Sequence, residues 1–195
     1  MEERVSKQSI RSKYLGYRDN LSFSERKAKS REIWSRLKQL ECYKKADVVL
    51  VYMDYRSEVM TTGLVEELLS EESGKKVYAP RVEGLDIFFY EIKELNDLKP
   101  GYQGIREPEK NPLTMFSEKE YSEKNCLVLV PGAVFDRELF RMGYGKGFYD
   151  RFIHKYDNII KAGLSFSCQI AKQIPIEAHD KKMDYIITEN AVFKA

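Results

Sequence analysis

The residues best suited to chemistry form one short run, Arg141-Met142-Gly143-Tyr144-Gly145-Lys146-Gly147-Phe148-Tyr149-Asp150. Its three glycines stand at alternate positions, so the backbone can come close to a ligand and can adopt positive φ. The run opens a predicted helix, whose first amide groups and dipole favour an anion. Arg141 and Lys146 add positive charge. The run therefore suits a polyphosphate ligand.

The spacing excludes the two commonest phosphate-binding fingerprints. No Ser or Thr follows a GxxxxGK pattern, as a Walker A loop requires, and the glycines are spaced GxGxG rather than GxGxxG. A glycine-rich turn before a helix is more often structural than ligand-binding. From the spacing alone, a structural turn therefore stays open beside a polyphosphate site.

Two basic residues near the start of the chain could join such a site. Lys7 and Arg11 lie four positions apart in a predicted helix, so they share one face and can reach the same phosphate group. Arg18 falls on nearly the same line. A solvated helix surface is the usual alternative for such residues.

Hard oxygen donors occur at Asp150 and Asp180. Mg²⁺ typically takes one or two carboxylates together with phosphate oxygens and water, so this pair predicts a magnesium-phosphate site. The alternatives are a charge early in a helix for Asp150 and a turn residue for Asp180. His179 could tune such a site, although a lone surface histidine is the default interpretation.

The hydrophobic pattern predicts the elements that must position these residues. Two helices come first, at residues 7–18 and 24–40, and Ser22 and Glu25 have the spacing of a capping box before the second. Further helices are predicted at 62–72 and 147–156. The predicted strands are 46–53, 76–82, 86–92, 126–130, 160–166 and 184–188.

Residues 93–125 are polar and contain several Pro and Gly, which predicts a long surface excursion. Strands that alternate with helices predict one α/β domain over residues 1–195, with a mostly parallel sheet preceded by two helices. In such sheets ligands bind beyond the carboxyl ends of the strands. The loops that follow the strands are therefore the expected site.

The composition and the charge limit the classes of protein to which the chain could belong. The 33 basic and 31 acidic residues give a net charge of +2, which is no reason to expect a general polyanion binder. Basic residues do concentrate in residues 1–45, with 13 Lys and Arg against six Asp and Glu. We expect no membrane span and no signal peptide. The three cysteines are far apart and indicate reduced thiols in the cytoplasm.

The glycine-rich run resembles the RLGxGxGYYD signature of the 5-formyltetrahydrofolate cyclo-ligases, also called methenyltetrahydrofolate synthetases. Met142 replaces Leu in that signature, and Phe148 replaces the first Tyr of the pair. Shorter matches keep the family's order over nearly the whole chain. They are Lys7 with Arg11, then residues 57–59, 79–81, 104–108, 130–136, 174–175 and 179–180. Each match is weak, but their order and spacing together are specific.

The resemblance implies a three-layer α/β/α sandwich and an ATP-dependent enzyme. Its substrate would be 5-formyltetrahydrofolate, with or without a polyglutamate tail, and its products 5,10-methenyltetrahydrofolate, ADP and phosphate. In this family ATP phosphorylates the formyl oxygen, and the 10-nitrogen then attacks the activated carbon. ATP is the expected co-substrate and Mg²⁺ the expected metal. We expect a cytoplasmic monomer or weak homo-oligomer that binds neither nucleic acid nor membrane.

The resemblance also implies roles for individual residues. The catalytic residues are expected to be Lys146, Arg141 and Tyr149. The ATP site is expected to comprise Lys7, Arg11, Arg141, Met142, Gly143, Tyr144, Gly145, Lys146, Gly147, Phe148 and Tyr149. The folate is expected to contact Met53, Glu58, Tyr102, Tyr144, Phe148 and Tyr149, with Phe88 as a further candidate. The metal ligands are expected to be Asp150 and Asp180. For Glu58, a structural charge at the start of the next helix is the alternative.

Two other classes of protein stay open. A sugar-phosphate isomerase or CoA-transferase-like enzyme on the same sheet would use Glu58 or Asp150 as a proton-transfer base without ATP, because a shared fold does not fix function. A nucleic-acid-binding module would use the basic N-terminal helices, although the chain lacks interleaved aromatic residues or a groove-reading motif. Stabilisation by Mg-ATP, and not by RNA, would distinguish the cyclo-ligase.

Overall fold

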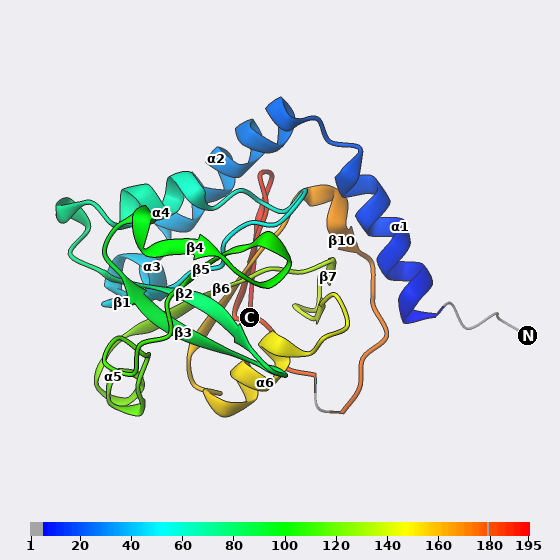
Figure 1. Ribbon diagram of the computed structural model, residues 1–195. Helices are drawn as coiled ribbons and strands as arrows, with labels where there is room; N and C mark the ends of the chain where they lie inside the picture. Colours follow the sequence, from blue (N-terminus) through cyan, green and yellow to red (C-terminus); the bar gives the residue numbers. More distant parts are fainter. Residues whose placement is uncertain (1–5, 179) are drawn as a thin grey trace, which may run out of the picture.

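The fold is seen in a computed structural model, which describes residues 6–178 and 180–195 (Figure 1). Its α-helices are α1 Lys7–Asp19, α2 Phe23–Gln39, α3 Glu41–Lys45, α4 Thr62–Leu68, α5 Glu118–Glu123 and α6 Phe148–Lys155. Its strands are β1 Val48–Leu50, β2 Lys76–Glu83, β3 Asp86–Ile92, β4 Leu98–Pro100, β5 Arg106–Pro108, β6 Cys126–Val130, β7 Val134–Asp136, β8 Arg141–Met142, β9 Ile160–Leu164, β10 Ile170–Ala171, β11 Tyr185–Ile187 and β12 Val192–Lys194. Short 3₁₀ turns are η1 Glu71–Ser73, η2 Leu95–Asp97, η3 Tyr102–Gly104 and η4 Ser167–Gln169.

The main sheet has seven strands in the order β12-β11-β9-β6-β1-β2-β3. The neighbouring pairs from β11 through β9, β6 and β1 to β2 are parallel. Only the edge strands β12 and β3 run antiparallel to their neighbours. This confirms the predicted α/β class with a mostly parallel sheet.

Helices cover both faces of the sheet because both faces of its central strands are apolar. Val49 and Leu127 belong to the core beneath α2 and α4. Their neighbours Val48 and Val128 point the other way, into the core beneath α6. Alternate side chains of a strand face opposite sides, so a continuously apolar strand must be buried on both. The result is three layers, α/β/α, as expected.

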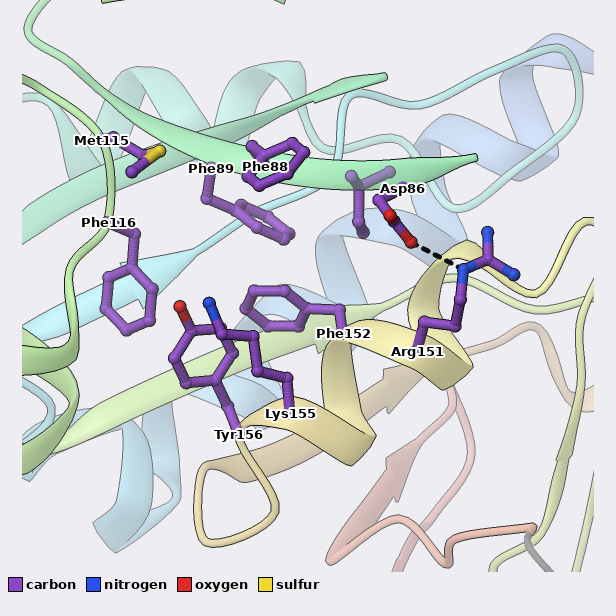
Figure 2. A pocket seen from close by; sticks show the side chains of 10 residues that line it. Asp86, Phe88, Phe89, Met115, Phe116, Arg151, Phe152, Lys155 and Tyr156 are labelled. Carbon is purple, nitrogen blue, oxygen red and sulfur yellow. Dashed lines mark hydrogen bonds and ion pairs between the residues drawn. The ribbon is translucent and has the colours of Figure 1, made fainter. Parts of the chain in front are cut away.

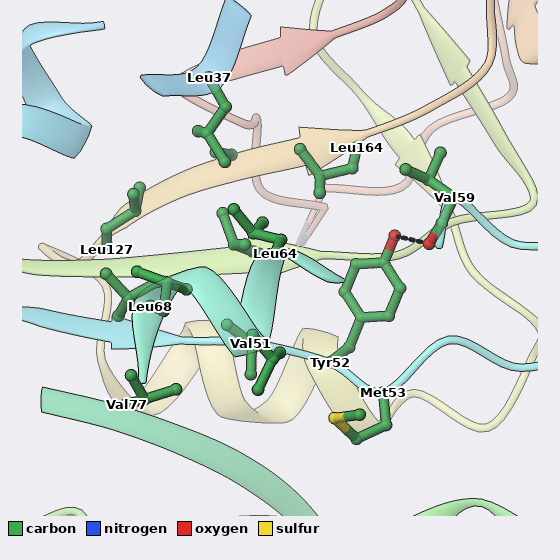
Figure 3. Packing of buried hydrophobic residues seen from close by; sticks show 14 of the residues in the cluster. Leu37, Val51, Tyr52, Met53, Val59, Leu64, Leu68, Val77, Leu127 and Leu164 are labelled. Carbon is green, nitrogen blue, oxygen red and sulfur yellow. Dashed lines mark hydrogen bonds between the residues drawn. The ribbon is translucent and has the colours of Figure 1, made fainter. Parts of the chain in front are cut away.

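The first of these cores is built from long aliphatic side chains. Figure 3 shows Leu37 of α2 and Leu64 and Leu68 of α4 gathered over Leu127 and Leu164 of the sheet. All five are at most 2% exposed. Burying one such side chain contributes about 1.5–3 kcal/mol relative to leaving it in water. This core holds the carboxyl end of β1, from which the site residues follow.

Helix α1 packs on a second, three-stranded sheet of order β10-β7-β8 rather than on the main one. Ile10 and Tyr14 lie against Val134 and Met142 in a small apolar cluster, and Ser6 caps the helix by accepting from the amide of Ser9. This packing lays the helix beside the segment that leads into the glycine-rich run.

Several element boundaries differ from the sequence prediction. The strand expected at 46–53 is regular only over Val48–Leu50, although Val51–Met53 stay buried. The helix expected at 62–72 ends at Leu68 and continues as η1, which closes at left-handed Gly74. The excursion at 93–125 contains β4, β5 and α5, and the short elements α3 and β12 were not predicted. The capping box of Ser22 and Glu25 is confirmed, with both reciprocal bonds present.

Two structural findings bear on the predicted lack of a membrane span and on the predicted reduced thiols. Within the part of the chain that the structure describes, no helix has the length and apolarity needed to cross a bilayer. The cysteines are unpaired, with Cys42 and Cys126 buried and Cys168 half-buried.

Candidate active site

A cavity of about 410 Å³ opens beyond the carboxyl ends of β1 and β6. Its walls come from the last turns of α1, the loop after β1, strand β2, the η3 turn and the run from Arg141 to Asp150. Most ligand pockets have volumes of about 300–1,000 Å³. The cavity therefore lies where an α/β sheet usually binds its ligand and is large enough to hold one.

The glycine-rich run, hereafter the glycine loop (residues 143–147), forms one wall of this cavity. Gly145 has φ +94° and Gly147, which caps α6, has φ +69°. Any other residue would be strained in this left-handed region, which explains glycine at both positions. Arg11 Nε donates to the carbonyl of Gly143 over 2.8 Å. The structure thus brings α1 and the glycine loop together, as predicted.

Arg141 and Asp150 are joined at the edge of the same cavity. Arg141 Nη2 pairs with Asp150 Oδ1, and Arg141 Nη1 donates to the carbonyl of Pro131 over 3.3 Å. The Arg141 side chain is only 4% exposed. Both residues line the cavity, together with Lys146. Cations and a carboxylate, the groups predicted to bind phosphate and magnesium, therefore lie at one place.

Glu58 lies on the opposite wall and is 6% exposed. Its Oε2 accepts the amide of Tyr55 over 2.9 Å, and its Oε1 accepts the hydroxyl of Tyr144 over 2.5 Å. Burial raises the pKa of the Glu58 carboxyl, while these two bonds and the charge of Arg18 act against the rise. The alternative role of Glu58, at the start of the next helix, belongs instead to Asp54, which accepts the amides of Thr61 and Thr62.

Behind Tyr144 lies a buried arginine that the sequence did not assign to the site. Arg18 is 3% exposed, and its Nη1 donates to the Tyr144 hydroxyl over 2.5 Å. Its Nε donates to Ser57 Oγ over 2.9 Å, and that hydroxyl donates in turn to Asp19. The only indication in the sequence was the spacing of Arg18, which places it on nearly the same helix face as Lys7 and Arg11.

Tyr149 presents an unsatisfied donor to the cavity. Its hydroxyl is buried and has no hydrogen-bond partner among the described residues. Burial, followed by the nearby Glu58 charge, raises the pKa of the Tyr149 phenol, so the hydroxyl stays protonated at neutral pH. A buried polar group without a partner costs about 1–3 kcal/mol. Such a group in a cavity points to a ligand acceptor that completes it.

Aromatic and thioether side chains line the rest of the cavity. Met53, Tyr102 and Phe148 are among them, and the rings of Tyr102 and Phe148 meet edge to face at 6.0 Å. Met142 does not line the cavity, because it is buried in the small cluster beneath α1. Phe88 does not line it either. Phe88 lines a second cavity instead, together with Ile87 and Phe89 of the same strand.

The predicted Lys7 and Asp180 lie together, but not in the lining of the cavity. Lys7 Nζ pairs with Glu177 Oε1 at 2.6 Å and lies 4.0 Å from Asp180 Oδ2. Asp180 Oδ2 also accepts the amide of Glu177 over 2.7 Å. His179 lies outside the described residues.

The site suits a magnesium ion that arrives with a polyphosphate better than a resident metal ion. Among the described residues no group of three or more His, Cys, Asp or Glu side chains could hold a metal by themselves. Of the two predicted metal ligands, Asp150 lies in the cavity lining, beside the cations of the glycine loop, and Asp180 does not. One carboxylate is enough where phosphate oxygens and water supply the other ligands of Mg²⁺.

The comparisons with known proteins agree on one family. The family model described as the 5-formyltetrahydrofolate cyclo-ligase family matches residues 3–189. A Schizosaccharomyces pombe protein named probable 5-formyltetrahydrofolate cyclo-ligase is 30% identical over 183 residues, which cover 86% of this chain and 87% of the relative. The 5-formyltetrahydrofolate cyclo-ligase of Haemophilus influenzae is 25% identical over 179 residues, which cover 89% and 92%.

Solved structures show the same relationship. The NMR structure of 5,10-methenyltetrahydrofolate synthetase from Aquifex aeolicus matches with a TM-score of 0.82 and 34% identity, over 96% of this chain and 92% of that one. The 5,10-methenyltetrahydrofolate synthetase of Mycoplasma pneumoniae matches with a TM-score of 0.73 over 94% and 99%, and at 22% identity it supports the fold alone.

The chain belongs to the 5-formyltetrahydrofolate cyclo-ligase family. It is a ligase that uses ATP to convert 5-formyltetrahydrofolate into 5,10-methenyltetrahydrofolate, as the resemblance implied. The comparisons do not favour an isomerase, a CoA transferase or a nucleic-acid-binding module.

Proposed function

We propose that this reaction takes place in the cavity between the glycine loop and Glu58, with ATP on the loop side and the pteridine on the Glu58 side. One observation carries the proposal. A cluster of cations, a buried carboxylate and an unsatisfied tyrosine hydroxyl face the same space of about 410 Å³. Phosphoryl transfer needs chiefly positioning and charge stabilisation, and this arrangement supplies both.

On the loop side, ATP would be held by its phosphates. The amides of the glycine loop and the first turn of α6 favour an anion. Arg11, held 2.8 Å from the Gly143 carbonyl, and Arg141 add fixed charge beside these amides. Lys7, one turn before Arg11, would extend the contact along the phosphate chain.

On the opposite side, Glu58 would accept the amino and ring N–H groups of the pterin. Met53, Tyr102 and Phe148 would form its walls, with Tyr144 and Tyr149 at the boundary between the two substrates. A carboxylate in this buried place binds such donors strongly, because burial limits the competition from water.

Chemistry would proceed at the meeting point of the two substrates. The formyl oxygen attacks the γ-phosphorus and the bond to ADP breaks. The 10-nitrogen then attacks the formyl carbon, loses its proton, and phosphate leaves with the formyl oxygen. Lys146 and Arg141 would stabilise the charge that develops on the transferring phosphoryl group. The Tyr149 hydroxyl would donate to an oxygen of the reacting centre, which is the acceptor it lacks.

A magnesium ion would be held by Asp150 and the phosphate oxygens, and it would neutralise phosphate charge when bound. Asp180 stays the second predicted ligand. Because Asp180 lies by Lys7 and outside the cavity lining, its contact would depend on a phosphate chain that reaches that far. Asp150→Asn is therefore expected to raise the Mg²⁺ concentration needed for half-maximal ADP formation far more than Asp180→Asn does.

The experiment that tests the proposal measures ADP release in the presence and absence of 5-formyltetrahydrofolate. One ADP per methenyl product is expected, with no turnover in excess chelator. Full turnover in chelator would rule out the magnesium-phosphate site, and ADP release without folate would show a separate nucleotidase.

We also propose that the chain works as one domain, in the cytoplasm, as a monomer or weak homo-oligomer, with neither nucleic acid nor membrane as a partner. Unpaired, largely buried thiols suit a reducing compartment. Sedimentation across a range of protein concentrations tests the oligomeric state.

A further inference from the structure

Tyr144 belongs to the glycine loop, yet its hydroxyl lies on the opposite side of the cavity. It donates to Glu58 Oε1 over 2.5 Å and accepts from Arg18 Nη1 over 2.5 Å. The Arg18 guanidinium also lies 5.6 Å from the centre of the Tyr144 ring. As a whole residue Tyr144 is 42% exposed, so its ring spans the distance from the surface loop to the buried carboxylate.

The hydrogen bonds that Glu58 accepts leave part of the acceptor capacity of its carboxylate for a ligand. A carboxylate has about four lone-pair positions, two on each oxygen. The amide of Tyr55 takes one on Oε2, and the hydroxyl of Tyr144 takes one on Oε1. One position on each oxygen remains, which is what a ligand with two adjacent N–H donors requires. Tyr144 therefore does not compete with such a ligand but fixes the plane of the carboxylate that receives it.

The same contacts favour the charged form of Glu58. Desolvation opposes the charge of a buried carboxylate, and here the hydroxyl of Tyr144 and the guanidinium of Arg18 oppose that effect. If the glycine loop shifted, Tyr144 would leave, and both Oε1 and Arg18 Nη1 would lose a buried partner. The carboxylate is thus complete only while the loop keeps this conformation.

We propose that Tyr144 is a positioning residue that couples the two halves of the site, so that a nucleotide on the glycine loop strengthens the binding of folate at Glu58. This inference rests on the proposed function, because it takes the glycine loop as the nucleotide site and Glu58 as the pterin acceptor. Nucleotide would hold the loop, the loop holds Tyr144, and Tyr144 holds the Glu58 carboxylate in its orientation. The coupling is reciprocal, since folate must then strengthen nucleotide binding by the same factor.

The test measures the affinity for 5-formyltetrahydrofolate by calorimetry, with and without a saturating non-hydrolysable ATP analogue and Mg²⁺. Couplings between sites typically change affinity 5- to 150-fold, and we expect the analogue to tighten folate binding about tenfold in the wild type. In Tyr144→Phe, which keeps the ring and removes the hydroxyl, this gain should largely vanish. Nucleotide affinity measured without folate should stay close to the wild-type value.

Tyr17→Phe is the matched control. It removes one hydroxyl from the same helix that carries Arg18, and Tyr17 is 46% exposed and outside the cavity lining. It should keep the full coupling. Undiminished coupling in Tyr144→Phe, or equal loss in Tyr17→Phe, would overturn the inference.

A double-mutant cycle shows whether Tyr144 acts through Glu58. In a Glu58→Gln background, adding Tyr144→Phe should change folate affinity much less than it does in the wild type. An undiminished effect would mean that the hydroxyl contacts the ligand directly, which contradicts a positioning role. Wild-type protein that binds neither 5-formyltetrahydrofolate nor the analogue would instead overturn the proposed function itself.

Discussion

Two cavities are lined by residues of both β3 and α6, and they differ in their polar groups more than in their aromatic lining. The second cavity, of about 260 Å³, is lined by the rings of Phe88, Phe89, Phe116, Phe152 and Tyr156 (Figure 2). Its charged side chains are exposed and are held in ion pairs. Arg151 Nε lies 2.7 Å from Asp86, and Lys155 lies 3.3 Å from Glu118.

The candidate active site has aromatic walls too, but some of its charged side chains are buried. Glu58 and Arg18 lie inside it at 6% and 3% exposure, and the Tyr149 hydroxyl has no partner among the described residues. Exposed ion pairs contribute little to stability, about 0–1 kcal/mol. Buried polar groups are costly unless they are satisfied. Aromatic rings and volume therefore do not identify a site here, whereas buried groups that need a ligand do.

The largest effect on folate binding is expected at Glu58. Glu58→Gln should raise the KM for 5-formyltetrahydrofolate by about two orders of magnitude, because two bonds to a charged acceptor, each contributing about 1.5–3 kcal/mol, lose that charge. The KM for ATP should change little, and the control variant Glu118→Gln, at an exposed residue outside the active-site lining, should leave both unchanged. Steady-state kinetics checks this, and a smaller folate effect in Glu58→Gln than in Glu118→Gln would contradict it.

The same residue predicts the acid side of the pH profile. Burial raises the pKa of Glu58, so the carboxyl takes up its proton at a higher pH than an exposed glutamate. Folate affinity should therefore fall as the pH drops through this raised value, and the fall should be absent in Glu58→Gln. A profile with the same acid limb in both proteins would assign the limb to another group.

Lys146→Ala should lower kcat by about 10²–10³ with little change in nucleotide affinity, because a preorganised cation acts mainly on the transition state. The neighbouring glycines remain, so the loop amides can still hold ATP. The measurement is kcat together with an independent nucleotide dissociation constant at unchanged melting temperature. A near-normal kcat would make Lys146 a solvated loop charge and Arg141 the better candidate.

Arg11→Ala and Lys7→Ala should raise the KM for ATP and leave the folate KM nearly unchanged. A lost charge-assisted bond costs about 1.5–3 kcal/mol. Arg11 should have the larger effect, because it touches Gly143 directly, while Lys7 is held by Glu177. Loss of folate affinity instead would move these residues to the other half of the site.

The smallest effect is expected in the second cavity. Phe88→Ala should leave both KM values and kcat close to wild type, because the residue does not line the active-site cavity. Urea unfolding should show only a modest loss of stability for this half-buried ring. A large rise in the folate KM would restore Phe88 as a pteridine contact.

Most of the fold could be predicted because its signals are local. The apolar runs at β1 and β6 read as buried parallel strands, and the capping box at Ser22 fixes the start of α2. The short strands β7, β8 and β10 escaped prediction, because two- or three-residue strands carry no period of their own. Their pairing nevertheless decides where α1, and with it Arg11, lies.

Residues of the candidate site could be predicted where their type and a sequence motif indicated the same role. They could not be predicted where the direction of a side chain in the fold decides the contact. Ile87 reaches the active-site cavity and Phe88 does not, and a shift of one position along a strand turns a side chain to the other face. Met142 is buried under α1 for the same reason. Arg18 lines the cavity and donates to the hydroxyl of Tyr144, a contact that no spacing in the sequence reveals.

The most direct test of the account is the absorbance of the methenyl-folate band after the protein is mixed with Mg-ATP and 5-formyltetrahydrofolate. The account predicts that the band grows in the complete mixture, fails to grow when ATP is withheld, and grows at a strongly reduced rate with Glu58→Gln at subsaturating folate. Growth of the band without ATP, or at an undiminished rate with Glu58→Gln, would contradict it.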